Sequence, residues 1–284
     1  MKFVFFGTPE FAAIVLNKLI VAGFIPEAIV CNPDRPAGRK KILTSPPVKQ
    51  LIANSKEQIE ILQPENPSDI IPYLSEIKPD IFIVAAYAKI LPKGVVGIPK
   101  LGAIGVHPSL LPKYRGASPI QSAILNGEEK TGVTLYLLDE KMDHGEIVSS
   151  IKYQVSSSDT YKTLEKKLAE LGGNLLAETL PKFLNGEIKP MPQNESEATY
   201  TKKISTQDAF VDEKKLDEAI GGKNPEAAEE IYGKILALTP EPGVWTLRQA
   251  HGKLQRVKLL EAELENGKLI LKVIQTEGQK PVNL

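Results

Sequence analysis

Only three histidines occur in this chain, and two of them lie just after apolar runs that are typical of strands. His107 follows the run 103–106, and His144 stands beside Asp143 in a turn that comes after the run 133–138. A histidine can act as a general acid or base near neutral pH, and a nearby carboxylate can orient it or accept a proton. His107 and Asp143 are therefore candidate catalytic residues. The alternative is a structural histidine at a strand end and an ordinary turn aspartate.

A second candidate feature is a stretch of positive charge. Residues 35–56 contain six basic side chains and no acidic one. Such a run is usually a solvated loop, but a mobile loop that uses the backbone freedom of Gly38 could also contact phosphates. The basic residues are Arg35, Arg39, Lys40, Lys41, Lys49 and Lys56. The pattern leaves a nucleic-acid contact open and confines it to one segment.

The composition excludes several classes of protein. The 284 residues include 35 Lys and Arg and 35 Asp and Glu, so the zero net charge disfavours binding of nucleic acid by bulk electrostatics. A hydrophobic fraction of 42% excludes wholesale disorder. Cys31 is the single cysteine, which excludes an internal disulfide and favours an intracellular location. No apolar run is long enough to span a membrane, and GTPEF at 7–11 lacks the glycine spacing of a dinucleotide site.

The first half of the chain alternates strand-like and helix-like segments. This alternation predicts an α/β fold with a doubly wound sheet. Ligands bind outside the carboxyl ends of the strands in such sheets, so the segments that follow the strands are the expected site. We expect strands at 2–6, 26–31, 81–86, 103–106 and 133–138, and a long helix over 159–184. The segments expected at the site are 7–9, 86–88, 107–109 and 139–145.

The character of the sequence changes after residue 189. Residues 190–205 are polar and rich in turn formers, which predicts a linker. In the remaining part, 206–284, a helix is expected near 226–238 and strands at 244–247, 255–262 and 269–275. The residues Glu265-Asn266-Gly267 predict a hairpin between the last two strands. A small β-barrel is the predicted C-terminal domain.

Seven segments carry a resemblance that runs in order over nearly the whole chain. They are GTPEFA (7–12), PDRPAGRKK (33–41), SPPVK (45–49), VAAYAKILP (84–92), HPSLLPKYRGASPIQ (107–121), TGVTLYLLDEKMDHGEI (131–147) and TPEPGVWT (239–246). Together they resemble the 10-formyltetrahydrofolate-dependent formyltransferase and hydrolase superfamily. The segment PDRPAGRKK and the C-terminal domain narrow the resemblance to the methionyl-tRNA formyltransferase family. It implies a Rossmann-like catalytic domain at 1–189 and an OB-like, tRNA-binding β-barrel at 206–284.

The resemblance also implies an activity and partners. The family transfers the formyl group of 10-formyltetrahydrofolate to the α-amino group of methionyl initiator tRNA, which serves translation initiation. A cytoplasmic, monomeric enzyme that needs neither a metal nor a membrane is the resulting expectation. The alternatives are a formyltransferase acting on an amino-sugar nucleotide, a formyltetrahydrofolate hydrolase, and a folate- or tRNA-binding protein weakened in catalysis.

The same resemblance assigns roles to individual residues. His107 and Asp143 match two of the family's three catalytic positions. Ser109, Leu110, Leu111 and Pro112 match the folate-binding segment. Tyr87, Ile90, Leu91 and Asp139 are expected to hold the pterin, and Arg35, Arg39, Lys40 and Lys41 are expected to contact the acceptor end of the tRNA.

The third catalytic position departs from the family. An asparagine usually stands there, two residues before the histidine, whereas this chain has Gly105. Glycine offers no side-chain donor to an oxyanion, and losing one such donor typically lowers the rate by about 10²–10³. A backbone N–H, a water or another side chain is expected to compensate. On the sequence alone, Gly105→Asn is expected to retain the activity or to raise it.

Overall fold

The computed structural model describes residues 1–38, 41–250 and 253–284. Within these residues the chain forms two compact units. The first consists of Met1–Arg115, Lys130–Gln154 and Glu165–Tyr200, and the second of Gly116–Glu129, Val155–Leu164 and Thr201–Leu284. The second unit therefore takes in two internal segments besides the C-terminal part, whereas the sequence suggested one division at 190–205. The domain limits 1–189 and 206–284 stay a prediction.

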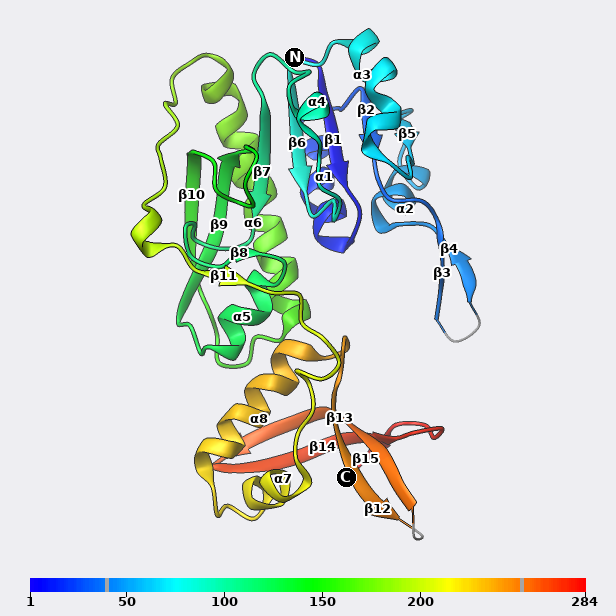
Figure 1. Ribbon diagram of the computed structural model, residues 1–284, viewed down its shortest axis with the longest axis vertical. Helices are drawn as coiled ribbons and strands as arrows, with labels where there is room; N and C mark the ends of the chain where they lie inside the picture. Colours follow the sequence, from blue (N-terminus) through cyan, green and yellow to red (C-terminus); the bar gives the residue numbers. More distant parts are fainter. Residues whose placement is uncertain (39–40, 251–252) are drawn as a thin grey trace. The chain divides into compact units, whose positions relative to one another are not determined.

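The first unit is built around a seven-stranded sheet with the order β10-β9-β7-β6-β1-β2-β5 (Figure 1). The strands are β1 (Phe3–Gly7), β2 (Ala28–Val30), β5 (Glu60–Leu62), β6 (Ile81–Ala85), β7 (Ala103–His107), β9 (Lys130–Leu137) and β10 (Ile147–Gln154). The five consecutive strands β5, β2, β1, β6 and β7 are parallel to one another. Strands β9 and β10 run antiparallel to their neighbours. The predicted α/β fold is confirmed, with a mixed sheet.

The central strands are continuous apolar runs because both faces of the sheet are covered. On one face, Val4, Phe6 and Phe82 pack with Leu74 and Val95, which belong to the helices α3 and α4. A Cβ on Gly172 would lie 3.0 Å from side chains of both β7 and β9, so α6 packs directly against the opposite face. The helices of this unit are α1 (Glu10–Val21), α2 (Pro47–Ala53), α3 (Ile71–Ile77), α4 (Lys93–Val96) and most of α6 (Tyr161–Leu184).

The end of β9 does not share an edge with the ends of the parallel strands. Strand β9 is antiparallel to β7, with Thr134 opposite His107 and Leu137 opposite the second residue of β7. The expectation that β9 ends at the same edge of the sheet as β7 is therefore wrong, although Asp143 of the segment 139–145 does lie beside His107. The segment after β9 instead turns back along the strand, and the N–H of Leu137 donates to the carbonyl of Glu146 (2.9 Å). The turn, rather than the strand direction, positions the segment.

The basic segment 35–56, whose charge pattern is usually that of a solvated loop, contains a two-stranded ribbon. Strand β3 (Arg35–Ala37) pairs antiparallel with β4 (Ile42–Thr44). Two of the predicted tRNA contacts, Arg39 and Lys40, lie outside the described residues. The predicted linker also carries regular structure, because β11 (Tyr200–Thr201) pairs with β8 (Arg115–Gly116) and a 3-10 turn covers Glu195–Glu197.

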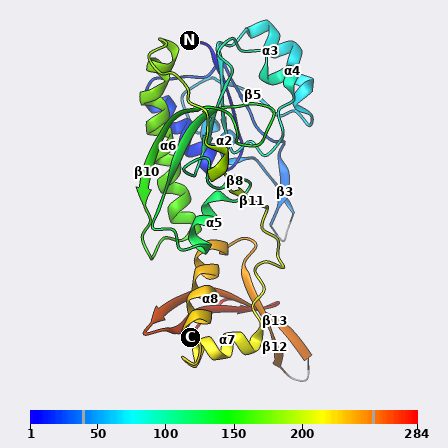
Figure 2. The same ribbon diagram turned by 60° about the vertical axis from the view of Figure 1, so that its left-hand side comes forward.

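The second unit contains a four-stranded antiparallel sheet in the order β12-β13-β14-β15. Asn266 and Gly267 have φ of 50° and 74°, which fits the predicted hairpin between β13 and β14. Helix α8 packs against β13, β14 and α5, and Figure 2 shows it running along the sheet. The elements are α5 (Pro119–Leu125), α7 (Glu213–Ile220), α8 (Pro225–Leu238), β12 (Val244–Ala250), β13 (Lys253–Glu265), β14 (Lys268–Thr276) and β15 (Val282–Asn283). Helix α7 was not expected from the sequence.

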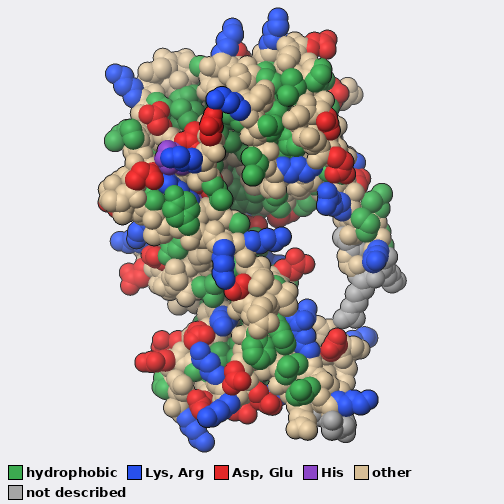
Figure 3. Space-filling view, viewed as in Figure 1, with side chains coloured by type: hydrophobic (Ala, Val, Ile, Leu, Met, Phe, Trp, Pro, Cys, Tyr) green, Lys and Arg blue, Asp and Glu red, His purple; other side chains and the backbone are tan. Residues whose placement is uncertain are grey.

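Charges of both signs are interspersed over the face of the molecule shown in Figure 3. This agrees with a net charge of zero. Within the described residues, no helix is both long enough and apolar enough to cross a membrane.

Candidate active site

His107 ends β7 with its ring almost buried, at 6% exposure for the residue. Its Nε2 lies 2.9 Å from the carbonyl oxygen of Tyr114. A carbonyl can only accept, so Nε2 carries a proton and donates it to this bond. The other ring nitrogen, Nδ1, faces Oδ2 of Asp143 at 3.6 Å. The two residues that the sequence marked as catalytic are thus brought together, with Nδ1 turned toward the carboxylate.

Asp143 is held from two sides although it lies in an irregular turn. Its backbone φ is 51°, a left-handed conformation that aspartate adopts more readily than most residues. The hydroxyl of Tyr136 donates to its Oδ1 at 2.6 Å. The amide Nε2 of Gln193 donates to the backbone carbonyls of Asp143 (2.9 Å) and Gly145 (2.8 Å). One carboxylate oxygen is therefore fixed by Tyr136, and the other faces His107.

The ring of Tyr136 covers the place where a side chain at position 105 would begin. Gly105 and Tyr136 are directly opposite each other in the β7–β9 ladder. A Cβ on Gly105 would lie 2.7 Å from Cζ of Tyr136, closer still to its Cε1, and 2.9 Å from Cδ1 of Leu138. This spacing contradicts the expectation that Gly105→Asn is tolerated, because the asparagine and the tyrosine ring would need the same space.

Burial keeps the hydroxyl of Tyr136 protonated. Desolvation, and after it the charges of Asp143 and Asp139, raise the pKa of Tyr136 well above 10. A neutral phenol can donate its one proton to a carboxylate, whereas a phenolate could not. The hydroxyl of Tyr136 therefore keeps the proton that it donates to Asp143 across the range of pH in which enzymes work.

His144 belongs to a second network, which reaches the site through Arg115 and Gln193. Its Nδ1 lies 2.5 Å from Oδ2 of Asp139, and its Nε2 lies 3.4 Å from Oε1 of Glu195. Glu195 also accepts two hydrogen bonds, at 2.6 and 3.1 Å, from the fully buried guanidinium of Arg115. These bonds lower the pKa of Glu195 and raise that of Arg115. Arg115 further donates to Oε1 of Gln193, so this network braces the amide that holds Asp143.

The predicted folate-binding segment forms a rigid wall beside His107. Ser109 is fully buried, and its hydroxyl donates to the carbonyl of Lys113 at 2.6 Å. Thr134 of β9 donates to the carbonyl of Ser109 (2.7 Å) and accepts from the N–H of Leu111 (3.1 Å). Leu110 is half-buried, and Leu111 and Pro112 are buried and joined by a cis peptide bond.

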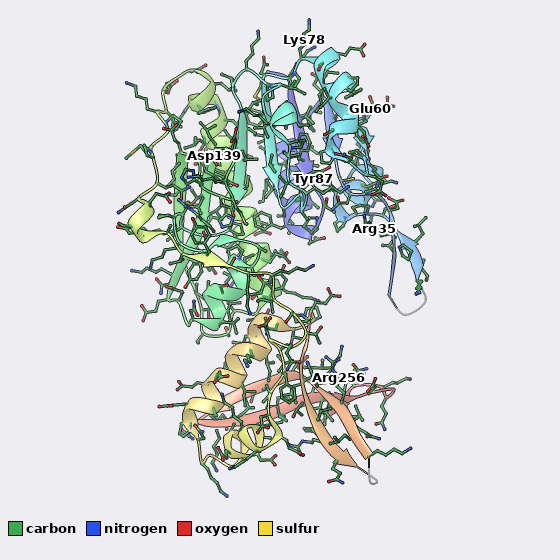
Figure 4. All side chains as sticks on the ribbon, in the orientation of Figure 1. Arg35, Glu60, Lys78, Tyr87, Asp139 and Arg256 are labelled. Atoms are coloured by element: carbon green, nitrogen blue, oxygen red, sulfur yellow. The ribbon has the colours of Figure 1, made fainter. Side chains whose placement is uncertain are left out.

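The residues expected to hold the pterin differ in their exposure. Tyr87 is 2% exposed, and its ring packs edge-on against Phe6 with a centroid distance of 5.4 Å. Burial raises the pKa of Tyr87 to about 12, and its hydroxyl has no partner among the described residues. Ile90 is 92% exposed. Leu91 is partly buried and packs against the core cluster that contains Phe6 and Tyr87. Figure 4 shows Tyr87 and Asp139 projecting from different segments of the first unit.

Asp34 neutralises part of the basic segment. Its carboxylate accepts from the ammonium of Lys49 (2.9 and 3.0 Å), the amide of Gln63 (2.8 Å) and the hydroxyl of Ser45 (2.9 Å). The bond from Gln63, followed by those from Lys49 and Ser45, lowers the pKa of Asp34 to about 2. Lys49 is therefore paired within the protein.

Arg35 and Lys41 belong to the ribbon formed by β3 and β4. Arg35 is exposed at the start of the ribbon (Figure 4), and its Nη2 lies 3.6 Å from Oε2 of Glu65. Lys41 is exposed at its turn, with φ of 48°. Both side chains are accessible to a large substrate.

Comparisons of the sequence with known proteins indicate one family. A model described as formyl transferase matches residues 1–180. The methionyl-tRNA formyltransferase of Kosmotoga olearia is 45% identical over 264 residues, which are 92% of this chain and 79% of that protein. The chain belongs to the methionyl-tRNA formyltransferase family. Like the other methionyl-tRNA formyltransferases, it is an enzyme that transfers a formyl group.

Solved structures share the fold. The methionyl-tRNA formyltransferase from Clostridium thermocellum matches with a TM-score of 0.60 at 18% identity and covers 100% of both chains. HypX from Aquifex aeolicus in complex with tetrahydrofolic acid matches with a TM-score of 0.66 at 16% identity, over 100% of this chain and 46% of HypX. The predicted class, a Rossmann-like unit with a smaller antiparallel unit consistent with a small barrel, is confirmed for this methionyl-tRNA formyltransferase.

Four residues of the site were not found from the sequence. They are Tyr136, Gln193, Arg115 and Thr134. The partner of Tyr136 is seven residues away, but the partners of Thr134, Gln193 and Arg115 are 23 or more residues away, so no short motif links these three to the site. The pairing of a glycine with an aromatic residue across two strands is the one signal that could have indicated Tyr136.

Proposed function

We propose that His107 and Asp143 are the proton-transfer pair with which this methionyl-tRNA formyltransferase moves the formyl group of 10-formyltetrahydrofolate to the α-amino group of methionyl initiator tRNA. The observation that carries the assignment is the approach of His107 Nδ1 to Asp143 Oδ2 at 3.6 Å. Both side chains are largely withdrawn from solvent, at 7% and 14% exposure. A carboxylate beside an imidazole in such a place is a suitable relay for one proton.

The chemistry requires a proton to move between two nitrogen atoms. A free α-amino group has a pKa of about 8, so the nucleophile must lose a proton to become a neutral amine. The amine attacks the formyl carbon, a tetrahedral oxyanion forms, and the bond from that carbon to the folate nitrogen then breaks. His107 and Asp143 would accept the proton released by the attacking amine and return it to the leaving folate nitrogen. Atoms and charges balance without a further reactant.

The residues around the pair fit a folate. Leu91 and Leu138 are partly exposed and pack against the core cluster that contains Tyr87, so they offer an apolar surface for a flat ring system. The buried, unpartnered hydroxyl of Tyr87 offers one polar group close to that surface. The folate complex of HypX, a structure of the same fold, also supports the proposal.

The exposed basic side chains of the ribbon would contact the tRNA. Arg35 and Lys41 belong to the ribbon, and Arg39 and Lys40 complete the predicted set. We expect Lys41→Glu to raise the KM for methionyl-tRNA severalfold and to leave folate binding unchanged, because phosphate contacts are electrostatic. Lys56→Glu, at an exposed position of the same basic segment, is the matched control. Equal losses for both variants, or a loss of folate binding, would contradict this part.

A transfer assay with a panel of acceptors tests the activity. Purified protein and 10-formyltetrahydrofolate are mixed with methionyl-tRNA, with an amino-sugar nucleotide, or with no acceptor other than water. The proposal predicts formyl-methionyl-tRNA as the main product. Formylated sugar or free formate as the main product would favour one of the alternatives. A cytoplasmic, monomeric enzyme is part of the same proposal, and fractionation and light scattering test it.

A further inference from the structure

We propose that Tyr136 is a positioning residue of this site. We also propose that the lack of a side chain at Gly105 in β7 leaves the space that the ring of Tyr136 occupies. In this arrangement the hydroxyl of Tyr136 fixes one oxygen of Asp143 and thereby keeps the other turned toward His107. The inference rests on the proposed function for the role of Asp143 and adds a third side chain to the pair.

The first step of the argument is the fit between Gly105 and Tyr136. The two residues are cross-strand partners, and their side chains start on the same face of the sheet. The position of a Cβ on Gly105 is already taken by the ring of Tyr136. The ring can therefore lie across β7 only because residue 105 has no side chain.

The second step concerns the place to which the ring carries its hydroxyl. From its position over β7, Tyr136 reaches Asp143 at 2.6 Å, within a site where both residues are shielded from water. A hydrogen bond to a carboxylate in such surroundings is stronger than a neutral one. The bond therefore resists rotation of the carboxyl group about its χ2 angle.

The third step concerns what a rotation would change. With Oδ1 fixed by Tyr136, Oδ2 lies 3.6 Å from Nδ1 of His107. The bond from Gln193 holds the main chain of Asp143 and does not set the direction of its carboxyl group. Tyr136 is thus a contact that does set this direction. Residue 105 has no polar side chain, and the polar group that reaches Asp143 is the hydroxyl of Tyr136 on the neighbouring strand β9.

Kinetics of Tyr136→Phe test the role of the hydroxyl. The variant keeps the ring over Gly105 and removes only the oxygen. We expect kcat to fall about 10- to 100-fold, the value of a hydrogen bond to a charged group, with the KM values for folate and methionyl-tRNA changed less than about twofold. Tyr73→Phe is the matched control, because it removes a tyrosine–carboxylate bond (2.8 Å to Glu60) outside the site. Its kcat is expected to equal that of the wild type.

A double-mutant cycle separates positioning from packing. If Tyr136 acts through Asp143, Tyr136→Phe should change kcat less than about twofold in an Asp143→Asn background. Losses that multiply in the double variant would overturn the proposal. So would wild-type kcat in Tyr136→Phe, or failure of that variant to fold, since the hydroxyl would then serve the fold and not Asp143.

A crystal structure of Tyr136→Phe gives a reading that needs no turnover. The proposal predicts that the carboxyl group of Asp143 rotates away from His107, and an unchanged carboxyl orientation would overturn it. Absence of transfer in the wild type would refute the proposed function instead, and the structure of the variant would still decide the role of Tyr136.

Discussion

Replacing Gly105 by alanine tests how closely β7 and the ring of Tyr136 fit. The added Cβ would lie 2.7 Å from Cζ of Tyr136 and 2.9 Å from Cδ1 of Leu138. Non-bonded carbons prefer separations of about 3.5–4.0 Å, so the overlap with the ring is on the order of 1 Å. The ring cannot move aside without cost, because the residue is 8% exposed and its hydroxyl is bonded to Asp143.

The expected loss of stability follows from this overlap. Overpacking of a filled core typically costs about 1–3 kcal/mol in unfolding free energy. For a unit of this size, each kcal/mol lowers Tm by about 2–4 °C, so Gly105→Ala should lower Tm by about 2–12 °C. The displaced hydroxyl should also lower kcat, by about the 10- to 100-fold expected for Tyr136→Phe.

Differential scanning calorimetry with two companion variants measures the effect. Gly94→Ala is the matched control, since its Cβ would make an ordinary contact of 3.7 Å with Ile71. In a Tyr136→Leu background the atoms Cε1 and Cζ are gone and the approach to Cδ1 of Leu138 (2.9 Å) remains, so Gly105→Ala should cost less than it does in the wild type. The reasoning is refuted if Gly105→Ala is as mild as Gly94→Ala, or if its cost is the same with and without the ring of Tyr136.

One further prediction concerns Asp34 beside the basic segment, and another concerns Arg115 beside the site. The pKa of Asp34 is about 2 against an ordinary 3.8, so its contacts stabilise the folded chain above about pH 4 and are lost as the pH falls toward 2. The Tm difference between wild type and Asp34→Asn should therefore be largest near neutral pH and shrink as the pH falls through about 2; a constant difference would contradict this. Arg115→Lys loses the planar fork that binds Gln193 and Glu195, so we expect a loss of about 1–3 kcal/mol in a urea titration and a lower kcat. Unchanged values of both would show that the network does not brace Asp143.

The sequence predicted five of the seven strands of the sheet from their apolar runs, and the β13–β14 hairpin because Asn266-Gly267 suits a left-handed turn. It did not predict the edge strands β5 and β10, which are only partly buried. It did not predict that β9 runs antiparallel to β7. The alternation of strands and helices does not fix the direction of a strand that follows the last crossover helix. Helix α7 was missed although Asp212 caps it and accepts from the N–H groups of Lys214 and Lys215. The helix has only eight residues and buries just Leu216 and Ala219, so it offers few apolar positions from which a helix could be predicted.

The candidate pair of the site could be named from the sequence, but its supports could not. His107, Asp143 and Tyr136 all stand in segments that carry the resemblance, but the role of Tyr136 depends on the register between two strands. Gln193 reaches Asp143 across 50 residues of chain. The glycine at 105 looked like a missing donor in the sequence. In the structure it is a space filled by Tyr136, which reverses the expectation for Gly105→Asn.

The most direct test of the account is the rate of formyl transfer to methionyl-tRNA in a single turnover, compared between the wild type and His107→Ala. General acid–base groups typically contribute about 10²–10⁴ to a rate. The account predicts transfer by the wild type and a loss of that size in the variant, with folate affinity retained. Transfer by His107→Ala at the wild-type rate, or none by the wild type, would contradict it.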